Sequence, residues 1–179
     1  MTNRHHDRAD EAGFTLVELV VVIVLVGILG GAVATILVNS WTTQNDVTTT
    51  SQATDRGQLI GQSIERAVRN AQAIDVSSDG TMLRVHTTQP GSKACQGFWF
   101  TGGAVYMTQR SGALPTTDVT TWPKAWQGQV VQHSGNPFFS TDGVTVTYMF
   151  DIDTDSAPVS FAGEAAMRVP TTGVTTPCW

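Results

Sequence analysis

A run of 25 residues from Phe14 to Val38, FTLVELVVVIVLVGILGGAVATILV, constrains this chain more than any other feature. As an α-helix the run would be about 37 Å long, at about 1.5 Å per residue, whereas the hydrocarbon core of a bilayer is about 30 Å thick. Arg4 and Arg8 precede the run, and the first basic residue after it is Arg56. The run can therefore span a membrane, and the positive-inside rule predicts a cytoplasmic N-terminus and an exported C-terminal part.

Glu18, the one charged residue of this run, separates three interpretations: a plain membrane anchor, a secretory signal peptide, and a helix that later enters an assembly. A carboxylate at such a depth costs roughly 2.5 to 3.5 kcal/mol on insertion scales, so it needs a cationic partner, which a plain anchor does not offer. A signal peptide has an apolar region of about 7 to 15 residues that ends in a small-x-small cleavage site. Ala32-Val33-Ala34 is such a site, but the run before it is too long and carries an acid. The third interpretation is favoured.

The segment Gly13-Phe14-Thr15-Leu16-Val17-Glu18 lies at the boundary between polar and apolar sequence. It resembles the processing motif of type IV prepilins, which include type II secretion pseudopilins and competence pilins. The resemblance implies that a prepilin peptidase cuts after Gly13, which removes residues 1–13 as a leader, and methylates the new terminal residue, Phe14. Glu18 then becomes the fifth residue of the mature chain, and the α-amine of Phe14 in the same or a neighbouring subunit is its expected partner during assembly.

The resemblance implies a structural, non-enzymatic subunit of a type IV pilus or related pseudopilus, and we prefer a minor subunit. Its partners would be the prepilin peptidase, other pilin subunits in a helical filament, the membrane before assembly, and indirectly an assembly platform and its ATPase. It would be a single-pass membrane protein first and part of a cell-surface filament later. The alternative is a secreted or membrane-anchored binding domain or enzyme that uses the N-terminal segment only for delivery. The net charge of −5 and the scattered basic residues predict no specific nucleic-acid partner.

Apolar residues after the first run recur at intervals of three and four, the period of an amphipathic helix. They are Ile60, Ile64, Ala67, Val68, Ala71 and Ile74. We therefore predict one helix from Phe14 to about Ala73, with a transmembrane and assembly half in residues 14–40 and an amphipathic half in residues 41–76. The segment Val47–Thr54 is its weakest part, because Thr and Ser are poor helix formers.

From Ser77 onward the sequence changes to short alternating runs, which predict a β-rich globular head over residues 77–179. The expected strands are Thr81–Thr87, a hairpin of Phe98–Phe100 and Ala104–Thr108 joined through Gly102-Gly103, Gln129–His133, Val144–Asp151 and Glu164–Val169. A long helix packed on a C-terminal antiparallel sheet is an α+β, pilin-like fold.

The chain has two cysteines, Cys95 and Cys178. In an exported domain an even pair predicts a disulfide, and two free thiols are the alternative. A disulfide that closes a loop of this length would contribute about 4 to 5 kcal/mol in the chain-entropy model.

Three alternating carboxylates, Asp151, Asp153 and Asp155, are the kind of oxygen ligands that calcium prefers. Ser156 and Ala162 stand where an EF-hand loop has Gly and Glu, so solvated loop acids are the favoured interpretation and calcium binding is the alternative. Calcium is the one candidate cofactor, and no other cofactor is expected.

Other residues could bind ligands or act in catalysis, but the sequence gives weaker evidence for them. Flat rings can stack on sugars or bases, and the candidates are Trp99, Trp122, Trp126 and Trp179. Core filling is the favoured interpretation for most of them, and if any of these rings serves recognition we expect it in the neighbourhood of Trp122-Pro123. His86 and His133 fall in predicted strands without flanking acids or cysteines, so we expect no ligand or catalytic role for them. No nucleophile motif, P-loop, dinucleotide fingerprint or zinc spacing occurs in the sequence, and we predict no enzymatic activity.

Overall fold

The computed structural model describes residues 13–91, 94–168 and 178–179. The chain divides into two compact units, Met1–Gln44 and Asn45–Trp179. Helix α1, Leu16–Arg69, is a single helix of 54 residues that runs from the first unit into the second. All strands belong to the second unit, which we call the head.

The first unit consists of the apolar part of α1. Every residue from Gly13 to Gln44 is exposed in the isolated chain, including large side chains on all sides of the helix such as Leu16, Ile28 and Ile36. A helix that is apolar on all sides requires a membrane or other protein to cover it. By length and composition α1 can cross a membrane, although a signal sequence near the N-terminus would pass the same test.

The Thr-rich segment Val47–Thr54, expected to be the weakest part of the helix, is helical in the structure. Thr49 Oγ1 donates to the carbonyl of Asp46 (3.1 Å), and Thr54 Oγ1 donates to the carbonyl of Thr50 (2.8 Å). These bonds satisfy the hydroxyl groups within the helix. They compete with the backbone N–H groups for the same carbonyl oxygens, which destabilises a helix slightly.

The helix ends at Arg69, and Ala71–Val76 form strand β1. From the sequence we predict a helix to about Ala73 and an amphipathic segment to residue 76, so the predicted C-terminal end of the helix is wrong. Asn70 stops the helix: its Nδ2 donates to the carbonyl of Arg66 (2.9 Å), and its backbone N–H donates to the carbonyl of Ala67 (3.2 Å) in a tightened last turn. The apolar residues that follow belong to β1, since Ala71, Ala73 and Ile74 pair with β2; Ala71 is buried and the other two are half-buried.

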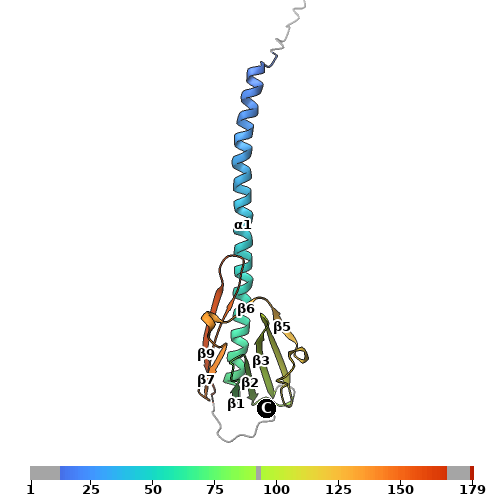
Figure 1. The fold of residues 1–179 in the computed structure, drawn as a ribbon, viewed down its shortest axis with the longest axis vertical. Coiled ribbons are helices and arrows are strands. Elements are labelled where there is room, and N and C mark those ends of the chain that lie inside the picture. Colours follow the sequence, from blue (N-terminus) through green and yellow to red (C-terminus); the bar gives the residue numbers. More distant parts are fainter. Residues whose placement is uncertain (1–12, 92–93, 169–177) are drawn as a thin grey trace, which may run out of the picture. The chain divides into compact units, whose positions relative to one another are not determined.

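Two antiparallel sheets make up the head, flanking the C-terminal part of α1 (Figure 1). The first has the order β1-β2-β3-β4-β5, with β2 Met82–Thr87, β3 Cys95–Thr101, β4 Ala104–Arg110 and β5 Lys124–Gln127. The second is built around β8 Thr145–Ile152, which pairs with β6 Val130–Val131, β7 Phe139–Thr141 and β9 Val159–Ala166. Short 3-10 helices occur at Val119–Thr121 and His133–Gly135. The α+β fold predicted from the sequence is confirmed.

Most predicted strands exist, with changed bounds. The strand at Thr81–Thr87, the hairpin through Gly102-Gly103 and the strand at Val144–Asp151 correspond to β2, to β3 and β4, and to β8. The strand expected at Gln129–His133 shrinks to β6, because His133 begins a 3-10 helix. The strand expected at Glu164–Val169 begins earlier, as β9, and Val169 lies outside the described residues. Strands β1, β5 and β7 were not predicted.

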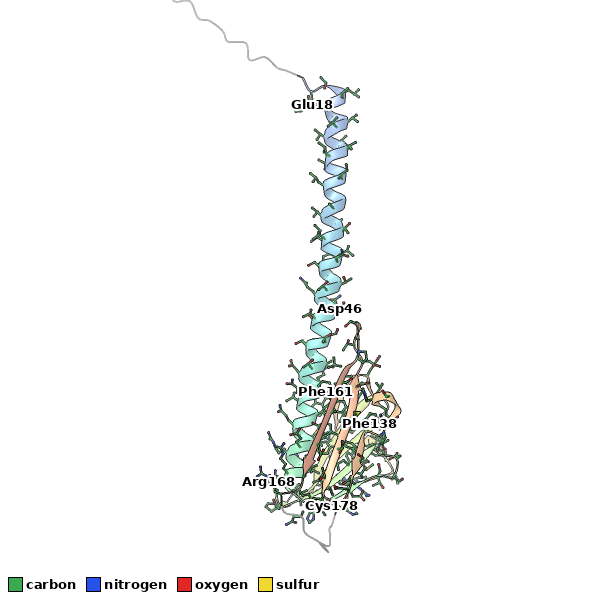
Figure 2. All side chains as sticks on the ribbon, turned by 90° about the vertical axis from the view of Figure 1, so that its left-hand side faces the viewer. Glu18, Asp46, Phe138, Phe161, Arg168 and Cys178 are labelled. Carbon is green, nitrogen blue, oxygen red and sulfur yellow. A yellow bond between two sulfur atoms is a disulfide. The ribbon has the colours of Figure 1, made fainter. Side chains whose placement is uncertain are left out.

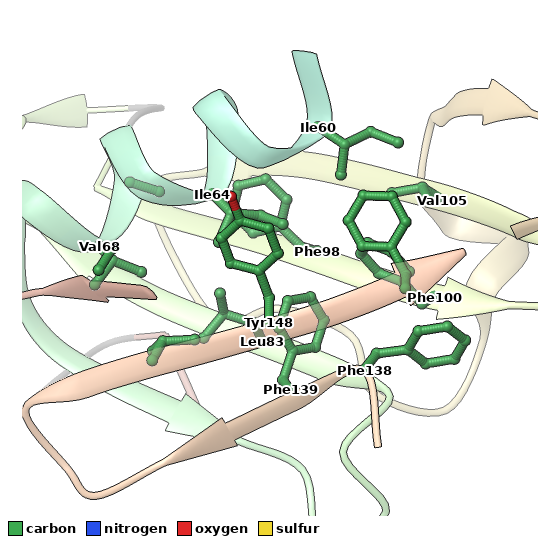
Figure 3. Packing of buried hydrophobic residues seen from close by; sticks show 14 of the residues in the cluster. Ile60, Ile64, Val68, Leu83, Phe98, Phe100, Val105, Phe138, Phe139 and Tyr148 are labelled. Carbon is green, nitrogen blue, oxygen red and sulfur yellow. The ribbon is translucent and has the colours of Figure 1, made fainter. Parts of the chain in front are cut away.

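The apolar stripe of α1 forms one side of the main core (Figure 3). Ile60, Ile64 and Val68 are fully buried and face aromatic and aliphatic side chains of both sheets. Around the ring of Phe100, the rings of Phe138, Phe139 and Phe150 lie with centroids 5.0, 5.0 and 5.3 Å away. Full burial of each such side chain stabilises the head by about 1.5 to 3 kcal/mol.

Two glycines on α1 admit the aromatic residues of the second sheet. A Cβ atom added to Gly57 would lie 2.1 Å from the ring of Phe161, and one added to Gly61 would lie 2.6 Å from the hydroxyl of Tyr148. Figure 2 shows Phe161 on β9 beside the helix. The glycines therefore serve as packing positions that let β8 and β9 approach the helix.

A second, smaller cluster lies around the disulfide between Cys95 and Cys178, which the structure forms as expected. Both cysteines are fully buried, together with Leu114 and Trp122. The backbone N–H of Leu114 donates to the carbonyl of Cys178 (2.9 Å). The bridge and this bond tie the C-terminus to β3 and to the segment between β4 and β5.

Candidate functional site

The start of α1 is set by Thr15, the residue just before the helix. Its Oγ1 accepts a hydrogen bond from the backbone N–H of Glu18 (3.2 Å), and its carbonyl accepts one from the N–H of Leu19 (3.1 Å). Thr15 is thus the N-cap of the helix, and the sequence Thr-x-x-Glu is that of a capping box. Sequence reasoning missed this role, although the pattern is readable as a helix-start signal.

Glu18 lies in the first turn of α1, as Figure 2 shows. It is the one charged residue between Gly13 and Gln44, and among the described residues it has no ion-pair partner. A carboxylate in the first turn interacts favourably with the positive end of the helix dipole. The isolated chain therefore gives Glu18 a local function in starting the helix, in addition to its expected function in assembly.

The bond between Gly13 and Phe14 lies in exposed backbone that is not helical. The Phe14 side chain is 80% exposed, and a Cβ added to Gly13 would meet nothing within 4 Å. A protease needs an accessible chain outside regular structure, and loops and ends provide it. The predicted cleavage position meets this requirement.

Residues 8–34 match the family model for the prokaryotic N-terminal methylation motif, the signature of type IV pilins and pseudopilins. The motif indicates a pilin-like prepilin substrate, and it suggests a structural protein. With the apolar helix it fits a membrane-anchored pilin. No curated protein and no solved structure matches the chain. The match identifies the N-terminal segment, while the rest of the chain is characterised by its α+β, pilin-like architecture.

The three candidate calcium ligands are not gathered into one site. Within the described ranges no group of three or more His, Cys, Asp or Glu residues could hold a metal ion. Asp151 Oδ1 lies 2.8 Å from Nδ1 of His133, and Asp153 and Asp155 lie in the turn between β8 and β9. Thr154 organises this turn by donating from Oγ1 to the carbonyl of Ala157 (2.7 Å).

His133, Asp151 and Ser160 resemble a hydrolase triad by composition but not by geometry. Ser160 Oγ lies 3.5 Å from Nδ1 of His133, the same nitrogen that contacts Asp151. A catalytic relay requires the acid and the nucleophile on different ring nitrogens. The other histidine, His86, has a buried Nδ1 with no hydrogen-bond partner among the residues described.

Trp122 is only 3% exposed, so core filling, the interpretation favoured for most of the tryptophan rings, is confirmed for Trp122, and the conditional choice of this ring for recognition was wrong. Its ring lies where Gly97 leaves room, since a Cβ there would approach it within 2.3 Å, and its Nε1 donates to the carbonyl of Pro115 (3.0 Å). Trp99 contacts it edge to face at 5.6 Å. Trp179 is 39% exposed, with the guanidinium of Arg84 5.5 Å from its ring centroid. These rings therefore do not form one continuous stacking surface.

Proposed function

We propose that this protein is a subunit, and more narrowly a minor subunit, of a type IV pilus or a related pseudopilus. A prepilin peptidase cuts the precursor after Gly13 and methylates Phe14. The mature chain then leaves the membrane and enters a filament through the apolar half of α1. The observation that carries the proposal is the methylation motif at residues 8–34, which leads into an apolar helical segment that is exposed at every residue from Gly13 to Gln44.

The start of the helix supports the same order of events. The N-cap at Thr15 leaves the Gly13–Phe14 bond outside the helix, where a peptidase can bind it. Cleavage creates an α-amine two residues before the first helical residue, Leu16. This amine supplies the cationic group that Glu18 requires in an apolar environment.

The orientation of the precursor follows from its basic residues. Arg4 and Arg8 lie in the leader, and no basic residue follows until Arg56. We infer a cytoplasmic leader and an exported head. The disulfide between Cys95 and Cys178 is consistent with an oxidising compartment.

Mass analysis of the N-terminus of the mature protein tests the proposal. The expected product begins with N-methylated Phe14, followed by Thr15. Retention of residues 1–13 contradicts the proposed processing, and a chain that begins at Thr35 indicates signal-peptide cleavage instead. Copy number in sheared filaments tests the narrower assignment, since a minor subunit is far less abundant than the principal one.

A further inference from the structure

A polar groove lies in the head between the last turns of α1 and the ends of β3 and β4. Its volume is about 370 Å³, within the usual range for small-molecule sites. We call it the amide groove, after the five carboxamide side chains that line it: Gln62, Asn70, Gln89, Gln96 and Gln109. Arg66 adds one positive charge to the lining, and among the residues that the structure describes no Asp or Glu contributes to it.

The groove begins where the apolar core of the head ends. Phe98 and Met107 are register partners on β3 and β4, and Phe98 is buried in the core. Two positions along, Gln96 and Gln109 form the corresponding pair and line the groove. Side chains two residues apart on a strand lie on the same face of a sheet, so the face toward the helix changes from apolar side chains to carboxamides between these two neighbouring pairs.

Several groups in the groove have unused hydrogen-bonding capacity. Within the part of the chain that the structure describes, the side chains of Gln62, Gln89 and Gln109 make no hydrogen bond, and Arg66 makes no ion pair. By contrast, the neighbouring Arg69 is paired with Glu65 at 2.8 Å. Three carboxamides and one guanidinium on one groove are therefore available to a ligand.

The chemistry of these groups defines the ligand class. A carboxamide both donates and accepts hydrogen bonds, as a hydroxyl group does, and a guanidinium binds a carboxylate through two parallel bonds. Arg66 gives the groove a local positive charge, which favours an anionic ligand although the chain as a whole carries a net charge of −5. Recognition falls to side chains, because β3, which carries Gln96, is paired on both sides by β2 and β4 and cannot accept a peptide strand.

We propose that the amide groove binds an acidic sugar, with its hydroxyl groups on the glutamine side chains and its carboxylate on Arg66. The site is independent of processing and assembly, since all its residues belong to the head. With the proposed function, which places the head outside the cell, the groove gives the protein a means of binding uronic-acid glycans.

Saturation-transfer NMR and calorimetric titration of the full chain test the proposal, in micelles of a phosphocholine detergent that carries no sugar. The probes are galacturonate oligosaccharides, with the matching galactose oligosaccharides as the uncharged comparison. Galacturonate should bind and galactose should bind on the order of tenfold more weakly, because charge-assisted hydrogen bonds are the stronger ones. No saturation transfer to either probe, or equal affinity for both, overturns the proposal.

Matched variants locate the site. R66A and Q62A, both at exposed helix positions, should each weaken galacturonate binding, R66A by on the order of tenfold. R69A and Q58A remove the same side-chain types from exposed positions outside the groove and should bind as the unchanged protein does. Binding that survives R66A and Q62A unchanged places the sugar elsewhere and refutes the assignment.

Discussion

In the first turn of α1 the backbone N–H of Glu18 donates to Oγ1 of Thr15, so the Glu18 side chain takes no part in this bond and has two separable functions of its own. One is local, as an acidic residue at the positive end of the helix dipole. The other is the proposed pairing with the α-amine of Phe14 after cleavage. Glutamine and alanine both remove the charge, but only glutamine keeps a side chain that can bond the backbone N–H of Thr15 as in a capping box.

E18Q and E18A should both reduce incorporation into filaments, by on the order of tenfold or more, because each leaves the terminal amine without its counter-charge in an apolar environment. Only E18A should also loosen the first turn, seen as faster amide exchange at Leu19, whose N–H bonds to Thr15. Quantification of the subunit in sheared filaments, with T15S as the capping control, checks this. Normal incorporation of E18Q contradicts the charge pairing.

Gly57 illustrates a residue whose importance depends on what packs against it. G57A should destabilise the head by about 1 to 3 kcal/mol, the usual cost of overpacking, because the new methyl group would overlap the ring of Phe161. G112A is the matched control, since a Cβ at Gly112 meets nothing within 4 Å. Urea unfolding followed by tryptophan fluorescence measures both, and equal midpoints for the two variants would refute the packing argument.

Tyr148 makes the stability of the head sensitive to alkaline pH. Desolvation, and then the hydrogen bond that its hydroxyl donates to Glu65 (3.1 Å), raise the pKa of this phenol from 10.0 to about 12. The folded state therefore keeps the proton where the unfolded state loses it, so this contribution to stability is complete below about pH 10 and disappears as the pH approaches 12.

Y148F should flatten the dependence of the unfolding free energy on pH between about 10 and 12, while costing about 1 kcal/mol at neutral pH for the lost hydrogen bond. Unfolding curves measured across this range, beside an absorbance titration of the phenols, provide the check. If the unfolding free energy of Y148F falls with pH as steeply as that of the native protein, groups other than Tyr148 cause the loss of stability at alkaline pH.

At the scale of elements, the disulfide and the small cluster around it hold the C-terminus against β3. The bridge joins Cys95 on β3 to Cys178 across a separation of 83 residues. Leu114 and Trp122, from the segment between β4 and β5, cover it. The cluster thus holds the C-terminus and the segment between β4 and β5 against the first sheet, although neither is hydrogen-bonded into that sheet as a strand.

The double variant C95A/C178A should be less stable than the native protein by about 4 to 5 kcal/mol in the chain-entropy model, because its unfolded state is no longer constrained. Comparing urea midpoints of the native protein with and without reductant tests the same quantity without substitution. If reduction leaves the midpoint of the native protein unchanged, the bridge does not stabilise the head.

At the scale of the whole molecule, apolar surface is divided between two environments. In the described part of α1 the first buried residue is Ala53, and the core of the head is formed entirely by residues from Ala53 onward. The exposed apolar side chains are concentrated between Phe14 and Trp41. The head therefore contains its own core, and the first unit needs a membrane or other protein to cover its apolar side chains.

A chain that begins at Asn45 should accordingly be soluble without detergent and unfold with the same urea midpoint as the full chain in micelles, because no core residue is lost. Size-exclusion chromatography and circular dichroism measure this. Aggregation of the shortened chain, or loss of its β-sheet signal, would show that the first unit contributes to the stability of the head.

The sequence alone determined the features that depend on composition and local spacing. The apolar run, its single acid and the processing motif are read directly, because a membrane-spanning helix needs only length and apolar side chains. The hairpin of β3 and β4 was predicted by Gly102-Gly103, and β8 by its period of two. The strand β1 was not, because its apolar residues continue a helical spacing and only pairing with β2 makes them a strand.

Tertiary structure decided what depends on neighbours distant in sequence. Gly57 and Gly61 look like weak points of a helix until the rings of β8 and β9 are placed against them. Trp122 looks like a loop residue until Gly97 and the disulfide cluster enclose it. The amide groove follows from no motif, since its side chains come from α1, the turn after it at Asn70, β3, β4 and the connection between β2 and β3. Local sequence fixes helix starts, periods and turns, whereas burial is set by contacts that only the folded chain brings together.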